Sequence, residues 1–157
     1  MKIELRNISL RYEGKPPLFQ DLDLTVHQGE FILIQGPSGS GKSSLLRLVN
    51  RLQDPSSGKI LIDGSPVLDQ DVTKLRRRVG YVQQTPIMVQ GSVADNLNLP
   101  FRFGSDREVR TPSDNELKSW MTDFLLEDVG LEHDAGKLSV GQKQRLAIAR
   151  AILRNPA

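Results

Sequence analysis

The chain has 157 residues, of which 38% are hydrophobic and 25% charged, with a formal net charge of +2 and no cysteine. Such a composition supports an apolar core, and the small net charge does not favour nucleic acid or an anionic membrane as a direct partner. Disulfides, thiolate metal sites and a cysteine nucleophile are excluded, and the isolated His27 and His133 do not make a zinc site. The sequence lacks the roughly 18-residue apolar stretch of a membrane span and a signal peptide, so we expect a cytoplasmic protein.

Alternating apolar and polar residues predict β-strands at the start of the chain. Ile3 and Leu5 share one phase, whereas Ile8 and Leu10 share the other. The phase changes near Asn7, which indicates a bulge or a break between two short strands. Alternation returns in residues 21–27, so the N-terminal part is predicted to be an antiparallel lobe with one solvent-facing side.

A continuous apolar run at residues 31–34 predicts a strand that is buried on both faces. A glycine-rich turn follows it. The next apolar residues recur at i, i+3, i+4 and i+7, the spacing of one helix face, and they are Leu45, Leu48, Val49 and Leu52. Beyond them, residues 59–64 predict a strand and turn, residues 71–78 a short helix, and residues 79–84 another strand.

The β signals fade in residues 85–136, where the spacing of apolar residues predicts helices at 91–97 and 113–130. Ser113 and Glu116 form a predicted capping box at the start of the second helix. Residues 100–112 read as a loop. A last helix is expected at 139–153, apolar on most faces after Arg145 and therefore buried.

A glycine-rich loop, Gly-Pro-Ser-Gly-Ser-Gly-Lys-Ser-Ser, separates the predicted buried strand from the helix that follows it. It matches the pattern G-x-x-x-x-G-K-[ST] with correct spacing. Such a loop turns backbone N–H groups toward phosphate oxygens, which requires conformations that glycine tolerates, and the helix N-terminus adds the positive end of its dipole. The predicted nucleotide-binding residues of the loop are Gly36, Pro37, Ser38, Gly39, Ser40, Gly41, Lys42, Ser43 and Ser44.

Two residues of the loop have separate chemical roles. Lys42 is expected to reach the β- and γ-phosphates of a nucleoside triphosphate, and the Ser43 hydroxyl to ligate Mg²⁺. A chance match in a glycine-rich turn is the alternative, and the predicted strand before and helix after the loop make it the weaker one. This motif indicates nucleotide binding without indicating the reaction.

Residues 138–145, Leu-Ser-Val-Gly-Gln-Lys-Gln-Arg, resemble the signature L-S-G-G-Q-x-Q-R of ATP-binding cassette (ABC) ATPases. Gln84 falls where the family has the glutamine of its Q-loop, and Tyr12 where it has an aromatic ring that stacks on adenine. The resemblance covers essentially the whole chain. It implies an α/β P-loop NTPase of the ABC type, with an N-terminal antiparallel β lobe and an inserted helical subdomain.

The resemblance implies that Ser139, Gly141 and Gln142 contact ATP bound to a second copy of the cassette, in a head-to-tail homodimer. It also implies that Gln84 senses Mg²⁺ and the γ-phosphate. Val140 departs from the family pattern, which has glycine there. A purely structural reading stands beside this one, because a serine at position 139 is a natural N-cap of its own helix.

In the family, an apolar strand ending in Asp-Glu would come next after residue 157, followed further on by a switch histidine. Asp63, Asp69 and Asp71 lie in turn-like segments and are expected to be solvated rather than to replace these carboxylates. We therefore expect a fragment that lacks the C-terminal core strands, leaves apolar residues at 31–34 and 147–153 exposed, and binds ATP without hydrolysing it. Its expected parts are 1–84 (β lobe and P-loop core), 85–136 (helical subdomain) and 137–157 (signature and following helix).

The function implied by the resemblance is that of an ATP-binding, ATP-hydrolysing subunit of an ABC transporter. Its partner would be an integral membrane permease that holds it at the inner face of the cell membrane, and no nucleic acid is expected. Residues 87–89, beside Gln84, either grip that permease or pack under the helical lobe. The alternatives are a non-transport ABC ATPase acting on DNA or ribosomes, and a nucleotide-binding module without catalysis.

Overall fold

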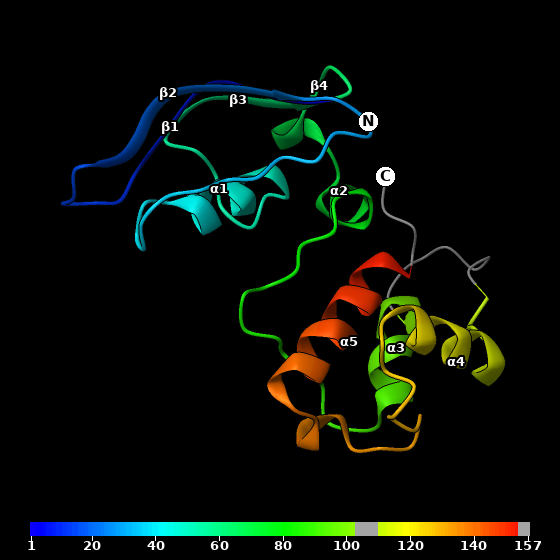
Figure 1. The fold of residues 1–157 in the computed structure, drawn as a ribbon. Coiled ribbons are helices and arrows are strands. Elements are labelled where there is room, and N and C mark those ends of the chain that lie inside the picture. The colour runs from blue at the N-terminus through cyan, green and yellow to red at the C-terminus, as the bar shows by residue number, and fades with distance from the viewer. Residues whose placement is uncertain (103–109, 154–157) are drawn as a thin grey trace. The chain divides into compact units, whose positions relative to one another are not determined.

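A computed structural model describes residues 1–102 and 110–153. The chain divides between Tyr81 and Val82 into two compact units. The first unit carries a sheet with helices α1 and α2, and the second carries helices α3, α4 and α5 (Figure 1). Each unit has its own apolar core. The three-part division predicted from the sequence stays a prediction.

The sheet of the first unit contains four antiparallel strands in the order β2-β1-β3-β4. They are β1 (Ile3–Arg11), β2 (Pro17–Val26), β3 (Ser57–Ile62) and β4 (Ser65–Pro66). The antiparallel N-terminal lobe expected from the alternating pattern is therefore confirmed.

The irregularity predicted near Asn7 is a register shift in β1, which lies between Leu5 and Ile8 in the pairing with β2. Asn7 itself has a φ of 50°. On the other side of β1, Gly58 of β3 has a φ of 92°, and a Cβ there would lie 2.4 Å from the carbonyl oxygen of Asn7. Only glycine fits at position 58, because any side chain would collide with the backbone of β1.

Helix α1 (Lys42–Val49) packs under the sheet (Figure 1), and α2 (Val72–Arg78) follows a 3-10 turn, η1 (Val67–Asp69). The apolar core of the first unit is formed by residues of the sheet, of α1, of η1 and of α2, namely Leu5, Ile8, Leu10, Leu48, Ile60, Ile62, Val67 and Leu75. The predicted helix face extended to Leu52, but α1 ends earlier. The chain turns at Arg51, which has a φ of 52°, and Leu52 is left 46% exposed.

The strands predicted at 31–34 and 79–84 are absent from the part of the chain that the structure describes. Residues 31–34 run without a hydrogen-bonded neighbouring strand, and Phe31 and Leu33 are 89% and 68% exposed. An apolar run favours an extended chain, but a strand also needs a partner to complete its ladder. The expected exposure of this run is confirmed, and the expected burial is wrong.

The second unit is helical, with α3 (Val93–Arg102), α4 (Asp114–Asp123) and α5 (Val140–Ile152), and a 3-10 turn, η2 (Ala135–Lys137). Its core consists of Val93, Leu97, Leu117, Met121, Leu126, Val129, Leu131, Ala135, Leu146 and Ala149. No described helix combines the length and the hydropathy of a membrane span.

Several details of this unit differ from the sequence-based expectation. The predicted capping box of Ser113 and Glu116 is present, but α4 ends at Asp123, because the chain turns at Leu125 with a φ of 53°. The predicted loop begins late, since α3 continues through Pro100 to Arg102, and residues 103–109 of that loop lie outside the described residues. Helix α5 buries Leu146, Ala147 and Ala149 but leaves Ile148 and Ile152 exposed.

Candidate nucleotide-binding site

The N-terminus of α1 stands at the end of the glycine-rich loop. Gly41 is its N-cap, with a φ of 93°, and no side chain caps the helix. A Cβ at Gly41 would lie 2.8 Å from two side-chain carbons of Leu18 in β2, so both the backbone conformation and the close packing on the sheet require glycine. The first amides of a helix have no intrahelical partner, and here no side chain of the helix's own cap takes their place.

The Lys42 side chain folds back over the loop. Its Nζ donates hydrogen bonds to the carbonyl oxygens of Gly36 and Pro37, at 2.8 and 2.7 Å. An ammonium group has three donors, so one remains available after these two bonds. Both partners are neutral, which leaves the positive charge uncompensated by a carboxylate in these contacts. The loop, the uncapped helix end and this charge together suit a polyphosphate.

Tyr12 contacts the first turn of α1, and its stacking on adenine stays a prediction. Its hydroxyl shares a hydrogen bond with Ser44 Oγ at 3.1 Å and accepts another from Gln53 Nε2 at 3.1 Å. The bond with Ser44, followed by that with Gln53, lowers the pKa of the Tyr12 hydroxyl below its usual value. The Tyr12 side chain is 42% exposed, so an aromatic surface remains beside the loop. Ser43, the predicted Mg²⁺ ligand, is exposed on the same turn.

The N-terminus of α5 is built differently. Ser139 Oγ accepts a hydrogen bond from the backbone N–H of Gln142 at 3.2 Å, and the Ser139 N–H donates to Gln142 Oε1 at 2.9 Å. This complete capping box confirms that Ser139 caps its own helix, and its contact with nucleotide stays a prediction. It leaves the Ser139 hydroxyl hydrogen available to donate to a ligand, because a hydroxyl accepts and donates at once.

Gln142 is held at both ends of its side-chain amide. Its Oε1 belongs to the capping box, and its Nε2 donates to Asp128 Oδ2 at 3.1 Å. Val140 is 71% exposed on the first turn of α5. A Cβ at Gly141 would have only ordinary contact, 3.6 Å from Arg145 Nη1. The contacts of Ser139, Gly141 and Gln142 with nucleotide stay predictions.

Gln84 is exposed in a bend of the second unit. The structure therefore gathers Tyr12, Lys42, Ser43 and Ser44 at one site of the first unit, while Gln84 and the signature residues belong to the second unit. The role of Gln84 in sensing Mg²⁺ and the γ-phosphate stays a prediction.

The three aspartates set aside in the sequence are exposed. Asp63 accepts a hydrogen bond from the Lys2 N–H and pairs with Arg78, and these contacts, the first above all, lower the pKa of its carboxyl group. Asp71 caps α2 by accepting from the Lys74 N–H at 2.8 Å. Among the residues that the structure describes, no cluster of three or more metal-ligating side chains is found.

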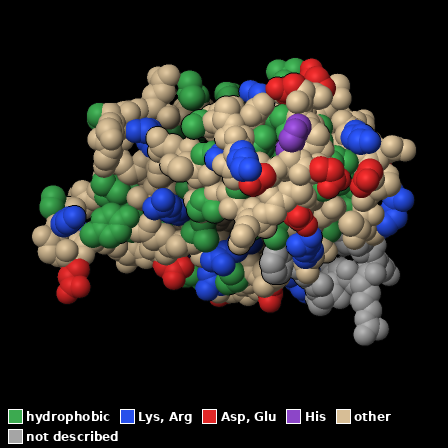
Figure 2. All heavy atoms as spheres, turned by 90° about the horizontal axis from the view of Figure 1, so that it is seen from below, with side chains coloured by type: hydrophobic (Ala, Val, Ile, Leu, Met, Phe, Trp, Pro, Cys, Tyr) green, Lys and Arg blue, Asp and Glu red, His purple; other side chains and the backbone are tan. Residues whose placement is uncertain are grey.

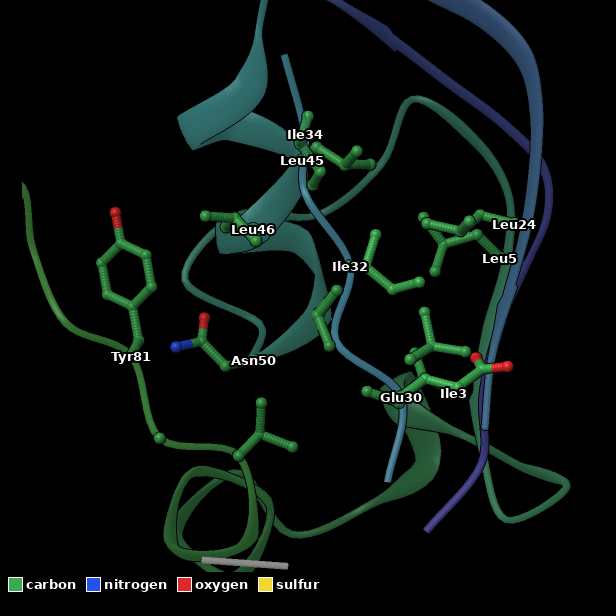
Figure 3. Close-up of a pocket in the computed structure, with 14 residues that line it drawn as sticks. Ile3, Leu5, Leu24, Glu30, Ile32, Ile34, Leu45, Leu46, Asn50 and Tyr81 are labelled. Atoms are coloured by element: carbon green, nitrogen blue, oxygen red, sulfur yellow. The ribbon is translucent and has the colours of Figure 1, made fainter. Parts of the chain in front are cut away.

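An apolar cavity of about 250 Å³ lies inside the first unit (Figure 3). Ile32 points toward Leu5 and Leu24 of the sheet, and Ile34 lies beside Leu45 of α1. The cavity also contacts Asn50, which is 3% exposed and accepts the Leu52 N–H at 3.3 Å. The exposed run at residues 31–34 therefore borders a space that the described chain does not fill.

Sequence reasoning missed the polar network of the second unit. Asn96 is completely buried in α3, and Arg150 of α5 donates to its Oδ1 at 3.3 Å. A signal was available, because a buried asparagine in an otherwise apolar helix face requires hydrogen-bond partners. At the surface, in the face shown in Figure 2, the acidic and basic side chains are interspersed and do not form a patch of one charge.

Comparisons with known proteins place these features in context. Residues 19–157 match the family model described as "ABC transporter". The chain is 37% identical over 161 residues to antigen peptide transporter 2 of Mus musculus, covering 99% of this chain and 23% of that protein. It is 39% identical over 156 residues to protein STAR1 of Oryza sativa subsp. japonica, covering 99% and 44% of the two.

Two further relatives are exporters by name. The chain is 35% identical over 158 residues to the β-(1→2)glucan export ATP-binding/permease protein NdvA of Bradyrhizobium diazoefficiens, covering 98% of this chain and 26% of that protein. A solved structure of a bacterial Atm1-family ABC exporter with ATP bound matches with a TM-score of 0.84 at 30% identity, covering 99% of this chain and 28% of that one. The chain thus spans less than half the length of each of these four proteins.

Proposed function

We propose that this chain, which belongs to the ABC transporter family, is the part of a transporter that binds ATP and drives transport through nucleotide-dependent dimerisation. The observation that carries the proposal is the N-terminus of α1. There, Gly41 leaves the helix without a side-chain cap, and Lys42 holds an ammonium group over the loop. These donors suit the β- and γ-phosphates of ATP, and the exposed Ser43 hydroxyl is available to Mg²⁺.

The other half of the proposed site is the start of α5 in a second copy of the chain, arranged head to tail. Gly141 supports this proposal. Glycine in a helix costs up to about 1 kcal/mol relative to alanine, yet the described residues do not demand it, since a Cβ there would have only an ordinary contact with Arg145 Nη1. A small residue is needed there if a partner approaches the backbone closely. We assign Ser139 as a γ-phosphate donor and Gln142 as the residue that holds its cap in place.

We assign Tyr12 to adenine stacking and Gln84 to sensing Mg²⁺ and the γ-phosphate. ATP, when bound, supplies the free energy of its hydrolysis, and the chain's own groups bind and orient it. The family's metal-binding aspartate and water-activating glutamate have no counterpart in this sequence, so we expect residues 1–157 alone to bind MgATP without turnover. The cavity beside residues 31–34 supports further core strands at that place in the complete cassette.

The second proposed partner is an integral membrane permease, which would hold the cassette at the inner face of the membrane. The names of the antigen peptide transporter and of the glucan ATP-binding/permease protein support transport over an action on DNA or ribosomes. The low net charge supports the same choice.

A cross-linking experiment tests the head-to-tail arrangement. Because the sequence contains no cysteine, a thiol reagent reacts only with the cysteines that are introduced. One chain carries Ser38→Cys in the loop and the other carries Val140→Cys at the signature. A short bifunctional reagent should link the two variants when they are mixed with MgATP. A cysteine in place of Glu13, in the exposed turn of the first unit, is the matched control and should give no MgATP-dependent link with Val140→Cys. Equal linkage with and without MgATP would contradict the proposal.

A further inference from the structure

The segment Ile87–Val89 has no regular secondary structure, yet its backbone is held closely by side chains. Asn96 Oδ1 accepts the Val89 N–H at 2.9 Å, and Asn96 Nδ2 donates to the Val89 carbonyl oxygen at 3.0 Å. These two hydrogen bonds have the donor and acceptor arrangement of a pair of strands, with the Asn96 amide side chain in the place of a neighbouring strand. A third bond of the buried side chain runs from Nδ2 to the Ser92 carbonyl oxygen at 3.0 Å.

Arg150 connects the same segment to α5. Its guanidinium donates to the Ile87 carbonyl oxygen at 2.8 Å through Nη2 and to Asn96 Oδ1 at 3.3 Å through Nη1. The side chain is half-buried, and burial lowers the pKa of its guanidinium. Both acceptors are neutral oxygens, so a partly desolvated charge is held by the backbone of residue 87 and by Asn96. Loss of this charged donor removes the bond to the Ile87 carbonyl oxygen and leaves Asn96 Oδ1 with the Val89 N–H as its remaining donor.

The segment presents one apolar side chain outward and one inward. Ile87 is 59% exposed, whereas Met88 packs against the core of the second unit. Three backbone polar groups of the segment, namely the Ile87 carbonyl and both groups of Val89, are bonded to side chains from α3 and α5. The orientation of Ile87 is therefore determined by α3 and α5 together.

We propose that Asn96 and Arg150 are positioning residues that fix the backbone of Ile87–Val89 to α3 and α5, so that a displacement of α5 is passed to the exposed Ile87. The transmission step rests on the proposed function, in which the other end of α5 contacts nucleotide. The clamp itself, meaning Asn96, Arg150 and the backbone groups they hold, is a property of the second unit alone.

The clamp is tested first without nucleotide, by amide hydrogen exchange of the 157-residue chain. Arg150→Met keeps an unbranched apolar stem and removes the donors. We expect the Val89 amide to exchange at least about tenfold faster. The Ala94 amide, bonded to the Leu131 carbonyl oxygen at 3.0 Å in the same unit, should change by less than about twofold. An equal acceleration of both amides would show general destabilisation and overturn the clamp, as would no acceleration at Val89.

Lys143→Met is the matched control. Lys143 is also a cation on α5 that donates to a backbone carbonyl, that of Gly136 at 2.7 Å. Its removal should leave the exchange of the Val89 amide unchanged. An acceleration equal to that in Arg150→Met would contradict a specific role of Arg150.

Transmission is tested with an environment-sensitive fluorophore on a single introduced cysteine. Gln144→Cys places it on an exposed position of α5, and Gln90→Cys places it beside the clamped segment. With saturating MgATP, both labels should shift in the otherwise unchanged chain, whereas Arg150→Met should abolish the Gln90 shift and keep the Gln144 shift. A Gln90 shift that persists in Arg150→Met overturns the transmission. If the label at Gln144 does not respond to MgATP, the proposed function is contradicted, and the transmission step that rests on it is contradicted too. The hydrogen-exchange measurement still decides whether the clamp exists.

Discussion

The two helices assigned to nucleotide contact, α1 and α5, begin in opposite ways. Helix α1 begins after a left-handed glycine and has no side-chain cap, whereas α5 begins with a complete capping box of Ser139 and Gln142. Helices α2 and α4 are likewise capped by side chains, of Asp71 and Ser113. Of the helices α1, α2, α4 and α5, α1 alone starts without a side-chain cap, and it does so where the sequence motif predicts phosphate. The first amides of α1 are therefore left for a ligand, whereas α5 satisfies part of its own N-terminus.

The largest effect is expected at Lys42, since it carries the charge of the uncapped end. Lys42→Ala should weaken MgATP binding to the chain by roughly 10- to 150-fold, the loss of about 1.5–3 kcal/mol for hydrogen bonds to a charged group. Isothermal titration calorimetry measures it. Lys143→Ala removes a lysine near the capped end and should leave affinity for the single chain unchanged. Equal affinities of the two variants would remove the distinction between the helix ends.

Gly41 at the start of α1 and Gly141 of α5 also distinguish the two helix ends, because packing among the described residues requires glycine at position 41 but not at position 141. Gly41→Ala should destabilise the first unit by roughly 1–3 kcal/mol, owing to the positive φ and the collision with Leu18. Gly141→Ala should stabilise the second unit by up to about 1 kcal/mol and yet abolish the MgATP-dependent cross-link between chains. Urea unfolding gives both stabilities, and a destabilising Gly141→Ala would contradict our account of that residue.

Ser139 combines a cap with a proposed phosphate contact, and two substitutions separate these roles. Ser139→Ala should cost about 1 kcal/mol of stability, the usual worth of an N-cap. Ser139→Asn retains a capping side chain and should unfold at nearly the same urea concentration as the unchanged chain. It lacks the hydroxyl, so the MgATP-dependent cross-link should weaken. A full cross-link yield with Ser139→Asn would leave Ser139 as a cap alone.

The smallest effect is a pH dependence that distinguishes α4 from α5. Glu116 closes the capping box of α4, and hydrogen bonds from Ser113, the backbone one first, lower the pKa of its carboxyl group. Because the folded pKa is lowered, this contribution is present above the ordinary value near 4.3 and is lost as pH falls through the folded pKa. The corresponding residue of α5, Gln142, does not titrate. The Ser113 amide shift in NMR spectra should therefore titrate in acid while that of Ser139 stays constant.

Local patterns predicted the parts of the fold that depend on local chemistry. The phase change near Asn7, the capping box at Ser113 and the loop before α1 follow from neighbouring residues alone, and they are found where the pattern places them. The strand predicted at residues 31–34 is absent from the structure, because an extended apolar run forms a strand only when a partner strand lies beside it. The early ends of α1 and α4 involve left-handed residues, Arg51 and Leu125, which no sequence signal marked.

The candidate site shows the same division. Motif spacing predicted the loop and Lys42, and the family resemblance predicted Tyr12. The Tyr12 bond to Ser44 and the Gln142 bond to Asp128 became visible only with side chains in place. The Asn96–Arg150 contact joins residues 54 positions apart. The sequence signals that a buried asparagine needs hydrogen-bond partners, but it does not indicate that Arg150 is one of them. The pairing of two chains stays a proposal for the same reason.

The position of the phosphate loop within the chain has a kinetic consequence. The loop and α1 lie in the connection between β2 and β3, and both strands pair with β1. The hairpin of β1 and β2 brings together residues that are close in sequence, so we expect it to form early. The pairing of β1 with β3 joins Ile3 to the distant Ile62, so we expect it to form later. We expect the position of α1 on the sheet to be fixed only once β3 has paired, so nucleotide binding should return later than the β1–β2 hairpin on refolding.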